Sequence, residues 1–395
     1  MKKTCFFLGL FGVLGIIGVL RAQESPFSLD WHGFVNPHYY ADSRSVVGGR
    51  EDMMLFFPKP VSIDPVTGRD LNDAWQANML AITARLGLRV TGPDALGAKT
   101  SAYIEGDFTG ATNDNINTLR LRHAYIDMNW ERHRLLAGQY WYAMVVHEIM
   151  PMTNPLNMGA PFHCYARQPQ VRYEYHLKGF EAVAVTQWQL DNKSQGLLDG
   201  APTPAAGSTQ FARHSLVPEF TAQLRYRTGH LFVGAAANLK TIQPVVPDPK
   251  GDLYSSFSWS LFGKYGLGGM DIKAQALFNN SLYEGCSLGG YLMLADGSFR
   301  DWHFNTVWLD VSRRGGKWRP GLFMGYAHNL DYGNTDYLYC FGRGHNMHYL
   351  WRVQPRLTYY ATDQLFATAE AEYTRAGYEV PVGNLRLSLS LTYAF

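Results

Sequence analysis

Charged residues are scarce in this 395-residue chain: Asp, Glu, Lys and Arg make up 17% of it, against about 25% in soluble globular proteins. The two signs nearly balance, at a formal net charge of +2, which excludes the strong basic field that nucleic-acid binders use. Aromatic residues reach 14%, and low charge with many aromatics is the opposite of a disordered composition. A mean hydropathy of −0.19 is too polar for a bundle of membrane-spanning helices. What remains is an all-β protein, either soluble or in an outer membrane.

Only one long apolar run is present, and it lies at the N-terminus. Lys2 and Lys3 precede the apolar residues 5–20, and the small residue Ala22 follows. This order is typical of a secretory signal peptide, and the run is short for a membrane span of about 20 residues. We therefore predict a cleaved signal peptide at residues 1–22 and a single exported domain at 23–395.

Cysteine is also rare, and its spacing argues against a metal site. Cys164, Cys286 and Cys340 follow the signal peptide, and neither a CxxC pair nor a Cys/His cluster with zinc spacing occurs. An exported chain permits one disulfide at most, with Cys286 and Cys340 as the candidate pair, and three free thiols are the alternative. No cofactor or metal is predicted.

Sustained helical periodicity is missing too, and alternation with a period of two takes its place. At the C-terminus, Leu385, Leu387, Leu389 and Leu391 alternate with polar residues, and similar stretches of ten to fourteen residues recur along the chain. Such stretches are longer than the strands of soluble proteins, which average about 5–6 residues. They favour the strands of a membrane barrel.

The connections between these stretches alternate between short and long. Seven short turns rich in Gly or Asp separate eight longer segments, near residues 42–77, 111–116, 146–168, 192–214, 242–252, 281–300, 330–345 and 378–383. Short periplasmic turns, longer outer loops and an even strand number are typical of outer-membrane barrels. We predict a transmembrane antiparallel β-barrel of about 16 strands, wide enough for an aqueous channel.

Two details of this strand pattern are expected to be irregular. The apolar phase slips near His123, which predicts a β-bulge there. Residues 287–294 have strand-like composition, but we assign them to the loop at 281–300.

Charges on the predicted strands take the phase opposite to the apolar residues, so they are expected to face the lumen. Basic residues outnumber acidic ones at these positions by fifteen to nine. The basic pore-lining candidates are Arg85, Arg89, Arg120, Arg122, Arg172, Arg225, Arg227, Arg352 and Arg356, and the acidic ones are Glu105, Asp107 and, from a loop, Glu148. An excess of positive charge between low-dielectric walls concentrates anions, whereas mutual pairing of Arg and Glu within the wall would cancel the effect.

The segment 146–168 is unusually apolar and rich in proline for an exposed loop. It follows the fifth predicted strand, where trimeric porins of this size place the loop that folds inward and narrows the channel. We expect it to do so here, with Glu148 facing the arginine rows. Packing on neighbouring loops or on another subunit is the alternative.

Evidence for catalysis is weak. Gly285, Ser287 and Gly289 match the G-x-S-x-G pattern of hydrolases, but that pattern has meaning only where a strand turns sharply into a helix. We therefore predict no catalytic residue and no enzyme. The alternatives to a channel are a structural barrel whose lumen is plugged by the loops 42–77 and 146–168, and an outer-membrane hydrolase.

Four blocks of sequence resemble the DcaP-type outer-membrane porins of Gram-negative bacteria. They are YIEGDF at 103–108, LRLRHAY at 119–125, AGQYW at 137–141 and RQPQVRY at 167–173, and with their spacing they cover about residues 78–177. The resemblance implies a sixteen-stranded, homotrimeric porin in the outer membrane, in contact with lipid. It also implies passive diffusion of small anionic solutes such as dicarboxylates. Carried over by position, it places Arg120, Arg122 and Arg172 in the pore wall, with Glu105 and Asp107 opposite.

Overall fold

The computed structural model of the protein describes residues 26–154, 157–248, 250–333 and 336–395, so the predicted signal peptide lies outside the described residues. Eighteen strand elements form one continuous sheet. β1 and β2 are two pieces of the first spanning strand, interrupted at Pro37, and β5 and β6 are two pieces of the second. Both β1 and β2 pair with β25, which closes the sheet into a barrel of sixteen spanning strands. The predicted fold class is confirmed.

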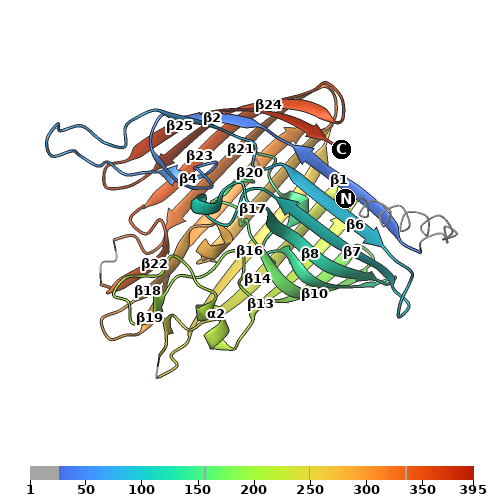
Figure 1. Ribbon diagram of the computed structural model, residues 1–395, viewed down its shortest axis with the longest axis horizontal. Coiled ribbons are helices and arrows are strands. Elements are labelled where there is room, and N and C mark those ends of the chain that lie inside the picture. The colour runs from blue at the N-terminus through green and yellow to red at the C-terminus, as the bar shows by residue number, and fades with distance from the viewer. Residues whose placement is uncertain (1–25, 155–156, 249, 334–335) are drawn as a thin grey trace, which may run out of the picture.

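The strand bounds follow the predicted turns and loops closely. The barrel elements are β1 (Ser28–Val35), β2 (His38–Asp42), β5 (Gln76–Leu80), β6 (Arg85–Thr91), β7 (Lys99–Asp107), β8 (Arg120–Asn129), β9 (His133–Trp141), β10 (Arg167–Leu177), β11 (Phe180–Gln187), β13 (Glu219–Thr228), β14 (Leu231–Ile242), β16 (Tyr254–Leu267), β17 (Met270–Asn280), β20 (Phe304–Arg313), β21 (Trp318–Asn329), β23 (Tyr349–Tyr360), β24 (Leu365–Ala376) and β25 (Val382–Ala394). Figure 1 shows the strands slanting across the barrel, with the C-terminus at one end and the β18, β19 and β22 region at the other.

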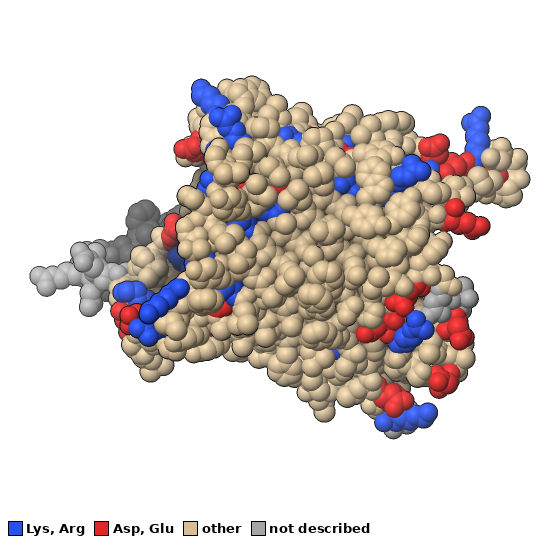
Figure 2. Space-filling view, turned by 180° about the vertical axis from the view of Figure 1, so that it is seen from behind, with Lys and Arg blue, Asp and Glu red and all other residues tan. Residues whose placement is uncertain are grey.

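Alternation on β25 shows how the sequence pattern becomes two faces. Leu387, Leu389 and Leu391 are exposed on the outside, whereas Ser388 and Ser390 between them are buried inside. Alternate residues of a strand point to opposite faces, so the outer face is apolar for lipid and the inner face is polar. The central band of the face in Figure 2 is accordingly mostly uncharged, and charged side chains gather toward its ends.

The predicted bulge near His123 is confirmed. Glu105 on β7 is in register with His123, and Gly106 is in register with Leu121, so Arg122 is the extra residue on β8. The bulge lets Arg122 and His123 both lie buried although they are adjacent in sequence.

Smaller elements lie in the long connections. These are β3 (Val46–Gly49), β4 (Met54–Pro58), η2 (Asn113–Asn115), η3 (His147–Ile149), β12 (Leu197–Leu198), α2 (Gln210–Ser215), β15 (Val245–Val246), η4 (Tyr283–Gly285), β18 (Gly289–Met293), β19 (Phe299–Trp302) and β22 (Tyr339–Arg343). Within the expected loop at 281–300, residues 289–293 do form a strand, but it belongs to a small sheet with β19 and β22 and not to the barrel wall. None of the helices in the described ranges is long and apolar enough to cross a membrane.

Candidate functional site in the barrel lumen

The connection between β9 and β10, residues 142–166, folds into the lumen as the sequence predicts. At its tip the backbone N–H of Asn154 donates to the carboxylate of Glu370 on β24, with both N···O distances 3.1 Å. The Asn154 amide also donates to Ser388 Oγ at 3.1 Å and accepts from Ser390 Oγ at 2.7 Å, both on β25. The loop thus starts at the fifth spanning strand and is anchored on the fifteenth and sixteenth. We call residues 142–166 the constriction loop.

Cationic side chains of the wall hold the constriction loop along its course. Lys273 Nζ donates to the carbonyl oxygen of Met150 at 2.9 Å, and Arg352 Nη1 donates to that of Ala160 at 2.7 Å. Glu148, on the loop itself, faces Arg225 at 3.6 Å and Arg227 at 3.4 Å. Glu148 thus lies beside two arginines of the barrel wall.

A second segment also enters the lumen, from the first long loop, which the sequence analysis placed there only in the plugged-barrel alternative. The β3–β4 hairpin of the first loop is buried, and its carbonyl oxygens accept hydrogen bonds from wall guanidinium groups. Arg386 donates to Asp52 O at 2.7 Å and to Met53 O at 2.9 Å. Arg352 donates to Leu55 O at 3.1 Å and to Phe56 O at 3.2 Å. We call residues 46–58 the luminal hairpin.

Between the luminal hairpin, the wall and the constriction loop lies a cavity of about 320 Å³. Seven basic and three acidic side chains line it, an excess of four positive charges. The basic ones are Arg50, Arg85, Arg120, Arg122, Arg167, Lys193 and Arg343, and the acidic ones are Asp107, Asp191 and Glu284. We call this space the arginine cavity.

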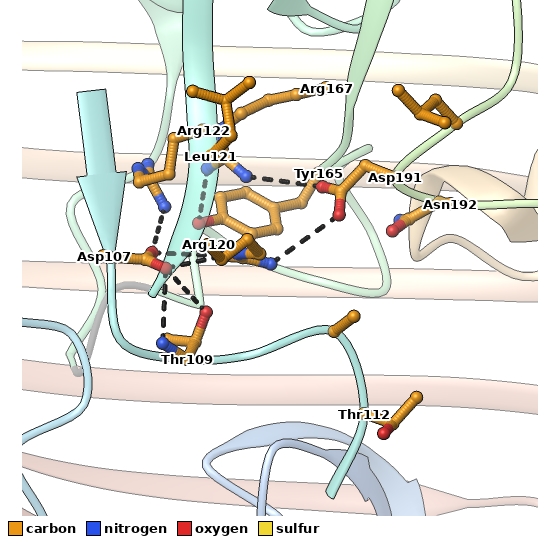
Figure 3. A network of polar contacts seen from close by, with 12 residues as sticks. Asp107, Thr109, Thr112, Arg120, Leu121, Arg122, Tyr165, Arg167, Asp191 and Asn192 are labelled. Carbon is orange, nitrogen blue, oxygen red and sulfur yellow. Dashed lines mark hydrogen bonds and ion pairs between the residues drawn. The ribbon is translucent and has the colours of Figure 1, made fainter. Parts of the chain in front are cut away.

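Strand register places the central charges of the arginine cavity. Asp107 on β7 is in register with Arg85 on β6 and with Arg120 on β8. Arg120 donates two parallel hydrogen bonds to the carboxylate of Asp107, from Nε to Oδ1 at 3.1 Å and from Nη2 to Oδ2 at 3.0 Å. Arg122 bridges Asp107 at 2.7 Å and Glu105 at 2.5 Å. Figure 3 shows Asp107 between the two guanidinium groups.

Arg167, at the start of β10, completes the basic wall. Its Nη2 donates to the hydroxyl of Tyr165 at 2.9 Å, and Asp191 lies 3.8 Å from its Nη1 (Figure 3). Burial alone would raise the pKa of Tyr165, but the positive charges of Arg167, Arg122 and neighbouring arginines outweigh burial and lower this pKa to about 7. The surrounding arginines thus favour the ionised form of the Tyr165 hydroxyl, which means that the electrostatic potential at this point favours negative charge.

The structure brings four of the twelve predicted pore residues to the arginine cavity: Arg85, Arg120, Arg122 and Asp107. Glu105 lies beside it, within 3.6 Å of Arg85. The other basic candidates have partners elsewhere on the inner wall. Arg89 lies over the ring of Tyr103, Arg172 pairs with Glu174, Arg225 and Arg227 pair with Glu148 and Glu181, and Arg352 pairs with Glu372.

Arg356 lines a second cavity of about 490 Å³ on the other side of the constriction loop, toward the short turns. Lys273, Arg313, Arg314 and Arg319 also line it, with Asp271 as the acid. Positive charge therefore predominates on both sides of the constriction loop. We call this space the inner cavity.

Sequence reasoning missed four of the seven basic side chains at the arginine cavity: Arg50, Arg167, Lys193 and Arg343. Arg167 precedes Arg172 by five positions, and an odd separation on a regular strand puts two side chains on opposite faces. At the strand end, however, the guanidinium group of Arg167 lies over the Trp141 ring, with Cζ 4.3 Å from the ring centroid, and the residue is buried. Arg50 belongs to the luminal hairpin of the first loop, where neither strand periodicity nor spacing singled it out.

Two other sequence expectations concern the loop at 281–300. Ser287 does not stand on a strand-to-helix turn: its hydroxyl accepts from Asn280 and donates to Pro161 O at 3.1 Å, an arrangement of loop packing. The considered Cys286–Cys340 disulfide is absent from the described chain, where both are free thiols. Cys286 accepts from Asn192 at 3.2 Å beside the arginine cavity, whereas Cys340 lies on β22 in register with Leu292.

Solved structures of outer-membrane barrels share this fold. The outer-membrane channel DcaP of Acinetobacter baumannii is similar at a TM-score of 0.71 and 19% identity, over 93% of this chain and 97% of that chain. An anion-selective porin from Comamonas acidovorans is similar at 0.58 and 11%, over 93% and 100%. The trimer form of OmpT, an outer-membrane protein of Vibrio cholerae, is similar at 0.55 and 10%, over 94% and 100%. No protein-family model matches the sequence, and no curated protein matches it either.

The chain is thus a sixteen-stranded barrel with the fold of outer-membrane porins. Within that class its architecture is similar to the DcaP channel, as the sequence blocks at 103–173 indicated.

Proposed function

We propose that the protein is a passive diffusion channel of a Gram-negative outer membrane, with a preference for small hydrophilic anions such as dicarboxylates. The arginine cavity is the observation that carries this proposal. Its lining has four more positive than negative side chains, and cations between low-dielectric walls raise the local concentration of anions. The inner cavity has a similar excess, so an anion meets positive charge on both sides of the constriction loop.

Reversal potential in a salt gradient tests this function. The full chain in a planar bilayer separating two KCl concentrations is expected to give the sign of an anion-selective channel. The double variant Lys193→Gln/Arg343→Gln removes two positive charges from the arginine cavity and is expected to shift the potential toward cations. The effect should shrink at high salt, because the screening length falls from about 10 Å at 0.1 M to about 3 Å at 1 M. A cation-selective wild-type channel would contradict the proposal.

A plugged structural barrel is the second candidate, because the luminal hairpin occupies part of the bore. That candidate predicts no single-channel current from the wild-type chain. A homotrimer is also proposed, by analogy with the trimer form of the OmpT neighbour. Native mass spectrometry in detergent would distinguish it from a monomer.

A further inference from the structure

The inner cavity combines positive charge with an apolar lining. Inward side chains of an outer-membrane barrel are normally polar, and Ser390 and Thr392 of β25, which line this cavity, follow that rule. Phe34, Tyr360 and Phe366 depart from it, since they belong to β1, β23 and β24, line the same cavity and are only half-buried. Apolar surface left in contact with water costs free energy, and patches of it often mark binding sites. The departure from the polar pattern indicates a solute with an apolar part.

The constriction loop supplies methionines to the same cavity. Met152 is 63% exposed although it lies inside the lumen, and Met158 is half-buried. Methionine side chains are flexible and make favourable contacts with aromatic rings and other apolar groups. The cavity has a volume of about 490 Å³, which lies within the range of small-molecule sites, about 300–1,000 Å³. An apolar group of a small solute therefore fits between the loop and the wall.

Arg319 brings positive charge to this apolar surface. Its guanidinium carbon lies 3.7 Å from the centroid of the Tyr360 ring, and Tyr360 stacks with Phe366 at 4.7 Å between centroids. Arg319 Nε donates to the carbonyl oxygen of Gly316 at 3.1 Å, and within the described ranges the side chain forms no ion pair with an acid. The residue is half-buried and lines the cavity. Its charge is therefore open to a carboxylate whose apolar body rests on the neighbouring rings.

We propose that the inner cavity binds monocarboxylates that carry an apolar ring or chain. The carboxylate lies at Arg319, and the apolar body lies between Met152 and the rings of Tyr360 and Phe366. The field of the lumen attracts every small anion alike, whereas this site distinguishes an anion with an apolar body from a hydrophilic one. The inference rests on the proposed channel function, because the solute reaches the cavity by diffusion through the lumen.

Block of the single-channel current tests the inference with the full chain in planar bilayers. Benzoate, acetate and succinate are added in turn to both sides. Acetate has the same charge as benzoate without the ring, and succinate has a second carboxylate without the ring. Benzoate should half-block the current at a concentration about tenfold below either of the others, the ratio produced when roughly 60 Å² of apolar surface leaves water. Equal or stronger block by acetate or by succinate overturns the inference.

Two further measurements separate this inference from the channel proposal. The reversal potential in a KCl gradient is recorded on the same channels, so a failure of anion preference is recognised by itself. Equilibrium dialysis of labelled benzoate and acetate against the chain in detergent makes the same comparison for a barrel that carries no current.

Three variants locate the site. Met152→Gln keeps the length of an exposed loop side chain but removes its apolar end. It should raise the half-blocking concentration of benzoate about fourfold, the effect of one buried methylene group, and leave block by succinate unchanged. Arg319→Gln removes the charge at the carboxylate and should raise the half-blocking concentration of benzoate about tenfold.

Met270→Gln is the matched control. Met270 lies at the same end of the barrel, in register with Arg313, but is not part of the cavity lining, so benzoate block should stay at the wild-type level. Met152 decides the question if Arg319→Gln fails to fold, because it is an exposed residue of a loop. Equal weakening by Met152→Gln and Met270→Gln, or unchanged benzoate block in Met152→Gln, overturns the site.

Discussion

At the scale of single residues, luminal arginines fall into two groups that the sequence does not separate. Arg120 is committed to Asp107, and Arg122 to Asp107 and Glu105, whereas Arg50 and Arg167 make no ion pair shorter than 3.8 Å among the described residues. Charges in the first group mainly hold three strands together. Charges in the second group are less fully neutralised by acids, so counting inward arginines overstates how many attract anions.

Removing the charge of Asp107 should therefore cost stability. Asp107 is 1% exposed, and Asp107→Asn leaves the buried Arg122 and the half-buried Arg120 with part of their charge uncompensated. Breaking a buried ion pair in this way typically costs about 3–5 kcal/mol. We expect a decrease of that size in the free energy of unfolding, measured by urea titration of the barrel in detergent. Asp94→Asn is the matched control, because Asp94 pairs with Lys99 at 3.5 Å on the surface, and its loss should cost about 1 kcal/mol or less.

At the scale of elements, the period-two pattern predicted the barrel because lipid outside and water inside impose it on every strand. The same pattern located the bulge near His123, where two adjacent side chains had to face inward. It failed for Arg167, since a strand end is free to depart from strict alternation, and for the luminal hairpin. The hairpin is held by side-chain donation from Arg352 and Arg386 to its carbonyl oxygens, and no local sequence signal marks the backbone that will accept those bonds.

The constriction loop was predictable from its position and apolar composition, but its anchor on β24 and β25 was not. Asn154→Ala removes the side-chain bonds to Ser388 and Ser390, each worth about 1 kcal/mol. We expect the loop tip to loosen and the single-channel current to become noisier and larger. The free energy of unfolding of the barrel, measured by urea titration, should stay within about 2 kcal/mol of the wild-type value.

Glu370→Gln serves as the control for this anchor. A glutamine oxygen can still accept the Asn154 backbone N–H that Glu370 accepts now, so the current should match that of the wild type. A quiet, unchanged current in Asn154→Ala would show that its side chain does not fix the loop.

At the scale of the whole molecule, the lumen is divided by two inward segments, and Arg352 donates hydrogen bonds to both of them. The constriction loop separates the arginine cavity from the inner cavity, with Asn157 lining the first and Asn154 the second. The luminal hairpin forms part of the boundary of the arginine cavity through Arg50, Met53 and Phe56. Conductance therefore depends on both segments, and the hairpin decides between an open channel and a plugged barrel.

Replacing residues 46–58 by a short glycine linker removes the luminal hairpin but leaves the spanning strands intact. Because the hairpin is buried inside the barrel, the open cross-section should grow and the single-channel conductance should rise about twofold or more. Loss of Arg50 with the hairpin should also weaken anion preference. Shortening the exposed part of the same loop, residues 61–69, is the control and should change neither property. If the wild-type barrel carries no current and conducts only after the deletion, the protein is a plugged barrel. If the deletion leaves the conductance unchanged, solutes pass the hairpin freely in the wild type.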